Sequence, residues 1–180
     1  MAAGVNLSSN WPRLSVSADF PPREQGGIPP MIEGTCGGGD TVTTETTRAA
    51  LEDTIDAFRR GDHARLAARY DDNIEWLLHA PTSIFPFAGL KQGKDAVLAG
   101  LLQVYQAYNI TRYEMRMTAV DGDRAATMAD IGLIQRSTGR VITAGLASFY
   151  RFRDGKVISY RGFTDSFDWA EQALGREIDP

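Results

Sequence analysis

The sequence is poor in the residue types that form disulfides and metal sites. It contains one cysteine, Cys36, and two histidines, His63 and His79, among 180 residues. A single thiol cannot form an internal disulfide, and neither histidine has a second histidine, a cysteine or a carboxylate pair at the spacing of known metal motifs. The sequence therefore predicts no disulfide, no bound metal and no cysteine chemistry.

Long apolar runs and an excess of positive charge are also missing. No window approaches the roughly 18 apolar residues of a membrane-spanning helix, and the N-terminal stretch lacks the continuous apolar core of a secretion signal. The net charge of −4 comes from interspersed acids and bases, which leaves no basic stripe for a phosphate backbone. The glycine run 37–39 lacks the lysine and the preceding strand of a nucleotide-binding loop. We therefore expect a cytoplasmic protein without a cofactor that binds neither membrane nor nucleic acid.

The composition changes after residue 40. Residues 1–40 contain seven of the 18 glycines and five of the 8 prolines, and their apolar residues follow no period. Such a segment recovers little burial energy against a backbone ordering cost of about 1–2 kcal/mol per residue. We predict a flexible arm over 1–40 and one domain over 41–180. In the alternative, Trp11, Leu14 and Phe20 of this arm dock on a partner subunit.

Four segments of the domain carry the periodicity of amphipathic helices. Asp62 and Ser166 are placed to cap the second and the last of them, and Gly61 and Gly175 can end the first and the last in a left-handed conformation. The predicted helices span about 44–60, 62–70, 94–105 and 166–174.

The remaining segments are predicted to form strands. Turn sequences at 121–122, 137–139 and 154–155 separate the later ones and imply antiparallel neighbours. The predicted strands span about 74–79, 110–120, 124–135, 140–152 and 156–165. The element order ααβαββββα indicates an α+β protein, with helices on one face of a strongly curved mixed sheet that encloses an apolar pocket.

Three stretches of the sequence carry a family resemblance. They are AFRRGDHARLAARYDDNIEW before and into the first strand, PFAGLKQGKDAV before the long helix, and FYRFRDGKVISYRGFTD in the last hairpin. In these stretches and in its element order, over residues 44 to about 172, the chain resembles the SnoaL-like and ketosteroid-isomerase-like branch of the nuclear transport factor two superfamily. The resemblance implies the cone-shaped NTF2-like fold. It implies no single reaction, because that branch includes isomerases, cyclases, epoxide hydrolases, dehydratases and proteins with no known reaction.

The family's known catalytic groups match poorly. The resemblance places Thr54 where a ketosteroid isomerase has its oxyanion-binding tyrosine, and Leu77, within a residue or two, where it has its general base. An epoxide-hydrolase type would have an aspartate after Arg161, where this chain has Gly162, and its other pair would fall near Asp130. Loss of an acid at Gly162 would enlarge the pocket and remove its charge. Asp130 either faces the cavity with a shifted pKa or pairs with an arginine on the outer, dimer-facing side of the sheet, and we expect the second.

The first strand leaves two assignments open. Hydrophobicity places Trp76 and its alternate neighbours inside, whereas matching to the epoxide-hydrolase type places Glu75 and His79 there. If Glu75 and His79 face the cavity, they lie about 7 Å apart along the strand, roughly the spacing of a carboxylate–imidazole pair on one strand face. The carboxylate would then raise the proton affinity of the imidazole, which suits acid–base catalysis. Otherwise Glu75 is exposed and His79 bonds to the loop at Pro81.

The resemblance also implies a mostly apolar lining for the pocket, suited to a hydrophobic ring or a short acyl chain. Tyr108 matches a pocket position and could donate to a developing oxyanion. The other predicted lining residues are Trp76, Val104, Ile110, Leu133, Ala144, Leu146 and Thr164.

Two functions follow as hypotheses. In the first, the protein is a cofactor-free SnoaL-like enzyme, an isomerase, cyclase or hydrolase that acts on an apolar carbonyl or polycyclic substrate by proton transfer. His79 would be the base or acid, Glu75 would orient it, and Tyr108 would bind the oxyanion. In the second, the protein keeps the fold as a non-catalytic ligand-binding or dimeric assembly module.

Assembly can also be predicted from the sheet. Its outer face is expected to carry Met115, Met117, Met128 or their strand neighbours, and a sheet that is apolar on both faces needs a partner on the second one. The sequence therefore predicts a homodimer through this face.

Overall fold

The computed structural model describes residues 40–178 as four helices and six strands. The predicted arm lies outside the described residues except for Asp40, which begins the first helix. No helix of the described segment is long and apolar enough to cross a membrane. In chain order the elements are α1 (Asp40–Arg60), α2 (His63–Arg69), β1 (Tyr70–His79), β2 (Gly89–Gln92), α3 (Lys94–Ala107), β3 (Tyr108–Asp121), β4 (Arg124–Gln135), β5 (Val141–Arg153), β6 (Lys156–Phe163) and α4 (Ser166–Leu174).

The six strands form one mixed sheet in the order β2-β1-β6-β5-β4-β3. Strands β1 and β6 are parallel, and every other neighbouring pair is antiparallel. The predicted α+β class and mixed sheet are confirmed. The sequence missed β2, because its four residues follow a proline- and glycine-rich loop and become a strand only by pairing with β1, as in Leu77 opposite Leu90.

The predicted helix ends are confirmed in most details. Gly61 and Gly175 adopt the positive φ angles of 65° and 66° that end α1 and α4. The Asp62 carboxylate accepts a hydrogen bond from the Arg65 amide at 3.0 Å and caps α2. The cap of α4 is Asp165, which accepts from the Asp168 amide at 3.1 Å, and the predicted cap Ser166 is instead the first helical residue.

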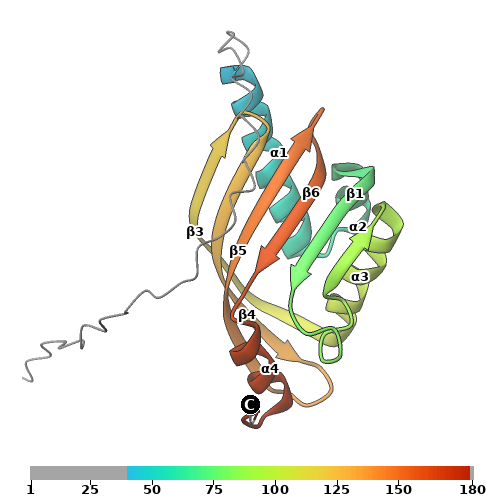
Figure 1. Cartoon of the computed structure of the whole chain (residues 1–180), viewed down its shortest axis with the longest axis vertical. Helices are drawn as coiled ribbons and strands as arrows, with labels where there is room; N and C mark the ends of the chain where they lie inside the picture. The colour runs from blue at the N-terminus through green and yellow to red at the C-terminus, as the bar shows by residue number, and fades with distance from the viewer. Residues whose placement is uncertain (1–39, 179–180) are drawn as a thin grey trace, which may run out of the picture. The chain divides into compact units, whose positions relative to one another are not determined.

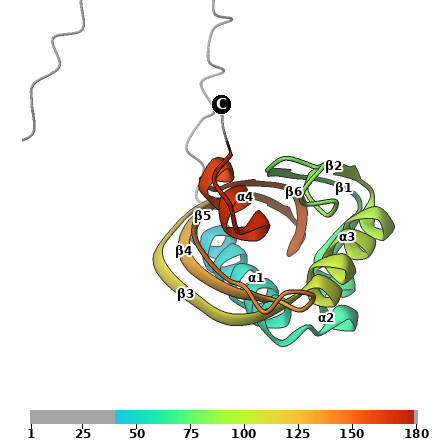
Figure 2. The same cartoon turned by 90° about the horizontal axis from the view of Figure 1, so that it is seen from below.

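The helices lie inside the curve of the sheet (Figures 1 and 2). Figure 2 shows β3, β4 and β5 bending around α1, with α3 across from them. Buried side chains alternate with more exposed ones over residues 74–79 of β1 and 148–153 of β5. Ile74, Ile142 and Val157 are completely buried. This arrangement is the cone-shaped fold expected from the family resemblance.

Helix α4 and the loop between β1 and β2 close one end of the domain. The Gln172 side chain accepts a hydrogen bond from the Thr143 amide at 2.8 Å and donates one to the Thr143 carbonyl at 2.9 Å, which fixes α4 to β5. The fully buried Phe85 of the loop stacks on Trp169 of α4, with ring centroids 4.4 Å apart. These contacts seal the apolar interior at this end.

An ion-pair cluster fixes α2 against α1. Asp53 of α1 accepts hydrogen bonds from the guanidinium groups of Arg65, at 2.8 Å from Nε, and Arg69. Arg65 also donates to Asp56 at 2.8 Å. Hydrogen bonds from Arg65 and then Arg69 lower the pKa of the Asp53 carboxyl.

We predict that Asp53→Asn lowers the free energy of unfolding by about 1 kcal/mol near neutral pH, because a charge-assisted hydrogen bond is lost. The lowered pKa means that the carboxylate's contribution is fully present above its ordinary pKa near 4. It disappears as the pH falls through the lowered folded-state value, so the gap between wild type and variant should close in acid. Urea unfolding at several pH values measures this gap, with Glu52→Gln as a control on an exposed carboxylate of the same helix. Equal losses in both variants would contradict the prediction.

Candidate functional site

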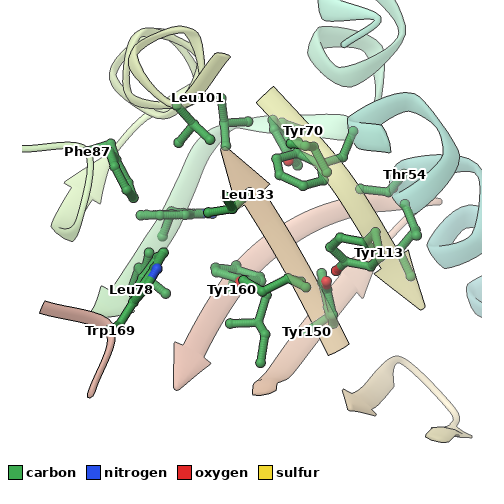
Figure 3. A pocket seen from close by; sticks show the side chains of 17 residues that line it. Thr54, Tyr70, Leu78, Phe87, Leu101, Tyr113, Leu133, Tyr150, Tyr160 and Trp169 are labelled. Atoms are coloured by element: carbon green, nitrogen blue, oxygen red, sulfur yellow. The ribbon is translucent and has the colours of Figure 1, made fainter. Parts of the chain in front are cut away.

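An apolar pocket lies between the helices and the inner face of the sheet (Figure 3). Its volume is about 90 Å³, and its lining comes from α1, α3 and α4, the β1–β2 loop and five of the strands. Leu101 and Val104 of α3 and Leu133 and Leu146 of the sheet supply much of its aliphatic surface. The pocket therefore belongs to the hydrophobic core itself, rather than to a surface cleft.

Hydroxyl groups line one end of this pocket. Figure 3 shows Thr54, Tyr113 and Tyr150 together, at the end away from Trp169. Burial raises the pKa of the Tyr113 and Tyr150 phenols, and it does the same for Tyr70 and Tyr160. These phenols therefore stay protonated near neutral pH, where they can donate hydrogen bonds.

Tyr160 shapes the middle of the pocket. Its ring stacks on Trp76 of β1 with centroids 5.1 Å apart and planes 15° apart. Its hydroxyl lies 3.2 Å from Ser148 Oγ, a buried partner on β5. A Cβ at Gly162 would lie only 2.6 Å from this hydroxyl and 2.9 Å from Leu78 Cδ1. The expectation that Gly162 enlarges the pocket is therefore wrong, because the Tyr160 phenol already occupies the space.

Part of the lining named from the sequence is brought together in this pocket. Ala144 and Thr164 are not among the lining residues. Tyr108 does not line it either: it is 4% exposed and packs edge-on against Phe87, with centroids 5.9 Å apart. The sequence-named residues that do line the pocket are Trp76, Val104, Ile110, Leu133 and Leu146.

Glu75 and His79 lie on the opposite face of β1. The Glu75 carboxylate accepts a hydrogen bond from Arg161 at 2.6 Å, and the exposed His79 ring stacks on Phe163 with centroids 4.3 Å apart. The inward positions of β1 belong to Trp76 and its alternate neighbours, as hydrophobicity indicated. The placement of Glu75 and His79 in the cavity, taken from the epoxide-hydrolase match, does not hold, because the strand's apolar face is the buried one.

The other charged candidates also lie outside the pocket. Asp130 accepts hydrogen bonds from Arg116 at 2.6 and 2.8 Å, which confirms its expected pairing with an arginine. Thr54 does line the pocket, and its hydroxyl donates to the Ala50 carbonyl of its own helix at 2.7 Å. Within residues 40–178, no three His, Cys, Asp or Glu side chains form a potential metal-ligand set.

Sequence reasoning named Trp76 but missed the other aromatic residues that line the pocket. Tyr150 and Tyr160 face inward while Arg151 and Arg161, the next residues, face outward. That arginine–aromatic alternation was available as a signal. No sequence signal could have found Trp169, because its place depends on how α4 docks.

Comparison with known proteins agrees with this geometry. A family model described as a SnoaL-like domain matches residues 51–160. A proposed isomerase from Rhodopseudomonas palustris is 37% identical, with a TM-score of 0.68 over 71% of this chain and 97% of that one. An NTF2-like protein from Burkholderia xenovorans (24% identity, TM-score 0.65, 72% and 97% covered) and an LEH-like epoxide hydrolase from Mycobacterium tuberculosis (15%, 0.61, 73% and 92%) share the fold. No curated protein matches the chain.

The contact between Tyr160 and Gly162 generates a prediction. Gly162→Ala should lower the free energy of unfolding by about 1–3 kcal/mol, because the added methyl group overpacks a filled site. Gly145→Ala is the matched control, since a Cβ there meets no atom within 4 Å, and it should change stability by less than about 0.5 kcal/mol. Adding Tyr160→Phe to Gly162→Ala should recover part of the loss, because it removes the nearest atom. If Gly162→Ala is as stable as its control, the close contact does not exist in solution.

Proposed function

The chain belongs to the SnoaL-like domain family, and on this basis we propose that it binds a small apolar molecule in the pocket between its sheet and helices. The observation that carries the proposal is the lining itself: aliphatic and aromatic walls with protonated hydroxyls at one end. Such walls favour an apolar body, and the hydroxyl end favours a small polar group on it.

The volume of the pocket limits the size of the ligand. At about 90 Å³ it is smaller than an engineered apolar cavity of about 150 Å³ that binds benzene. A single small ring or a short acyl chain is therefore favoured over a polycyclic compound, which would need lining side chains to move. At about 0.8 kcal/mol per buried CH₂, six carbons give roughly 5 kcal/mol before the entropic cost of binding. Affinities near the millimolar range follow for such small probes.

Isomerisation of a bound carbonyl compound is the second candidate, favoured by the name of the Rhodopseudomonas palustris relative. The phenols could stabilise a developing enolate oxygen by donating hydrogen bonds to it. A base that removes the proton is a separate requirement, and the lining side chains of the described chain include no carboxylate, imidazole or amine. We therefore propose ligand binding without catalysis ahead of isomerisation. Exchange of the α-protons of a bound ketone distinguishes these two functions.

The outer face of the sheet supports a further part of the proposal, a homodimer. The strand register aligns Met117, Met128, Ala147, Phe163 and His79 in one row across five strands. Met117, Met128 and Phe163 are 54%, 47% and 41% exposed, which is high for large apolar residues. Met115 is not part of this row, because it pairs with the completely buried Ala129.

Charges border this apolar row and favour a second copy as its partner. Glu114 and Asp130 lie opposite each other on β3 and β4, where Arg112 and Arg116 pair with both of them. A face with an apolar centre and both signs of charge at its edge can be complementary to itself about a two-fold axis.

We predict that Leu146→Trp, which fills the pocket, weakens binding of cyclohexanone by about tenfold or more. Leu102→Trp makes the same change on an exposed site of α3 and should leave the affinity unchanged. His79→Ala should also leave it unchanged, because His79 lies on the far face of β1. Titration followed by NMR measures all three. Equal affinity in wild type and Leu146→Trp would contradict binding in this pocket.

The same samples in deuterium oxide test the second candidate. Binding alone predicts that the protein does not accelerate exchange of the ketone's α-protons for deuterium. Accelerated exchange that disappears in Leu146→Trp would replace the binding proposal with the isomerase one, since removal of an α-proton is the first half of such a reaction and its replacement by deuterium records that step.

For the dimer, the double variant Met117→Glu/Met128→Glu should shift the protein to monomers. Burying four carboxylates at a two-fold contact is strongly unfavourable. Sedimentation velocity at micromolar concentration gives the distribution, and Leu102→Glu is the control on an exposed apolar residue off the sheet. A wild-type protein that sediments as a monomer would contradict the homodimer.

A further inference from the structure

His79 is the titratable member of the apolar row on the outer face of the sheet. The strand register aligns it with Met117, Met128, Ala147 and Phe163. Its side chain is exposed, at the end of the row on β1. Histidine is the side chain whose charge ordinarily changes between about pH 5 and pH 8. Proton uptake therefore places a positive charge in a row that is otherwise apolar.

The single copy can accept this charge at little cost. The His79 ring lies flat on the ring of Phe163, with centroids 4.3 Å apart and planes 11° apart. A cation over the face of an aromatic ring is attracted by the ring's electrons. The exposed face of the imidazole is in contact with water, which solvates the charge further.

The charged groups nearest to His79 are already paired. On β6, Arg161 precedes Phe163 by two residues and donates to Glu75 of β1 at 2.6 Å. Asp165 follows Phe163 by two residues, and its carboxylate accepts from the backbone of α4 at 3.1 Å. The outward neighbours on β1 and β5 and the first loop residues after β1 are uncharged: Leu77, Ala147 and 80–82.

A second copy on this face would take His79 out of water. In the proposed homodimer the apolar row of one copy packs on the row of the other. A charge in such a contact loses its hydration, which costs free energy unless an acid pairs with it. The acids that border the row, Glu114 and Asp130, are held by Arg112 and Arg116. The contact therefore favours neutral His79.

We propose that His79 makes the homodimer sensitive to pH: neutral His79 belongs to the contact, and proton uptake by its imidazole separates the two copies. This inference rests on the homodimer of the proposed function and adds its regulation. Because the separated copies bind the proton and the dimer does not, association is strongest above the range in which histidine titrates. It weakens as the pH falls through that range.

Sedimentation velocity over a concentration series tests the inference by measuring the dissociation constant of the dimer at two pH values. For a side chain that titrates near 6.5, lowering the pH from about 7.5 to about 5.5 changes a linked equilibrium by about tenfold per proton. Each dimer carries two copies of His79, so we expect the dissociation constant to rise by up to about a hundredfold. In His79→Gln it should change by less than about threefold. His63→Gln, the matched loss of the other histidine, should keep the wild-type response.

A second readout needs no change at His79. In His63→Gln, His79 is the only histidine, so the NMR signals of its ring protons titrate without overlap. Because the proton and the second copy exclude each other, the midpoint of this titration should rise as the protein is diluted from dimer to monomer. This measurement applies even if His79→Gln fails to fold.

The outcomes separate the two proposals. A dimer whose dissociation constant is the same at both pH values, or a pH response that survives in His79→Gln, overturns the role of His79 and leaves the homodimer standing. A midpoint that does not move on dilution overturns it as well. A wild-type protein that is monomeric at the higher pH refutes the homodimer and this inference with it.

Discussion

The parallel pairing of β1 with β6 is the contact on which the rest of the pocket depends. It joins two parts of the chain that are 86 residues apart, as between Glu75 and Arg161. The register places Trp76 beside Tyr160 and Leu78 beside Gly162. With that pairing made, the remaining strands are linked by antiparallel neighbours, and the sheet curves around α1. A slip of one residue would exchange the buried and exposed faces of β1 and bring Glu75 and His79 into the core.

The same register explains the chemical character of the pocket. It leaves no room at Gly162, because the Tyr160 phenol lies over the glycine and meets Ser148. It sends the charged partners Glu75 and Arg161 to the outer face, where water screens them. What remains inside is hydrocarbon, phenol and indole. Tyrosine phenols are protonated near neutral pH, and burial raises their pKa further. The described lining therefore offers hydroxyls but no carboxylate, imidazole or amine, and this polarity is the main argument for binding an apolar molecule that carries a small polar group.

Local features of the fold were predictable from the sequence, whereas the site was predictable only in part. Gly61, Asp62 and Gly175 act through their nearest neighbours, so their roles could be assigned from the residues alone. Strand β2 depends on pairing with β1, and no local signal marks it. In β1, the hydrophobic alternation gave the right inward face, while matching to a catalytic relative gave the other. The aliphatic lining followed from the family resemblance. The packing of Tyr160 over Gly162 and of Trp169 against Phe85 was not predicted.

The central claim is that a small apolar ketone binds inside the sheet and not on its apolar outer face. Nuclear Overhauser contacts between bound cyclohexanone and ¹³C-labelled methyl groups test this most directly. Leucine methyls report on the pocket through Leu101, Leu133 and Leu146, and methionine methyls report on the outer face through Met117 and Met128. The account predicts contacts from the ketone to the three leucines and none to the two methionines. Contacts to Met117 and Met128, with the leucine signals unaffected, would contradict it.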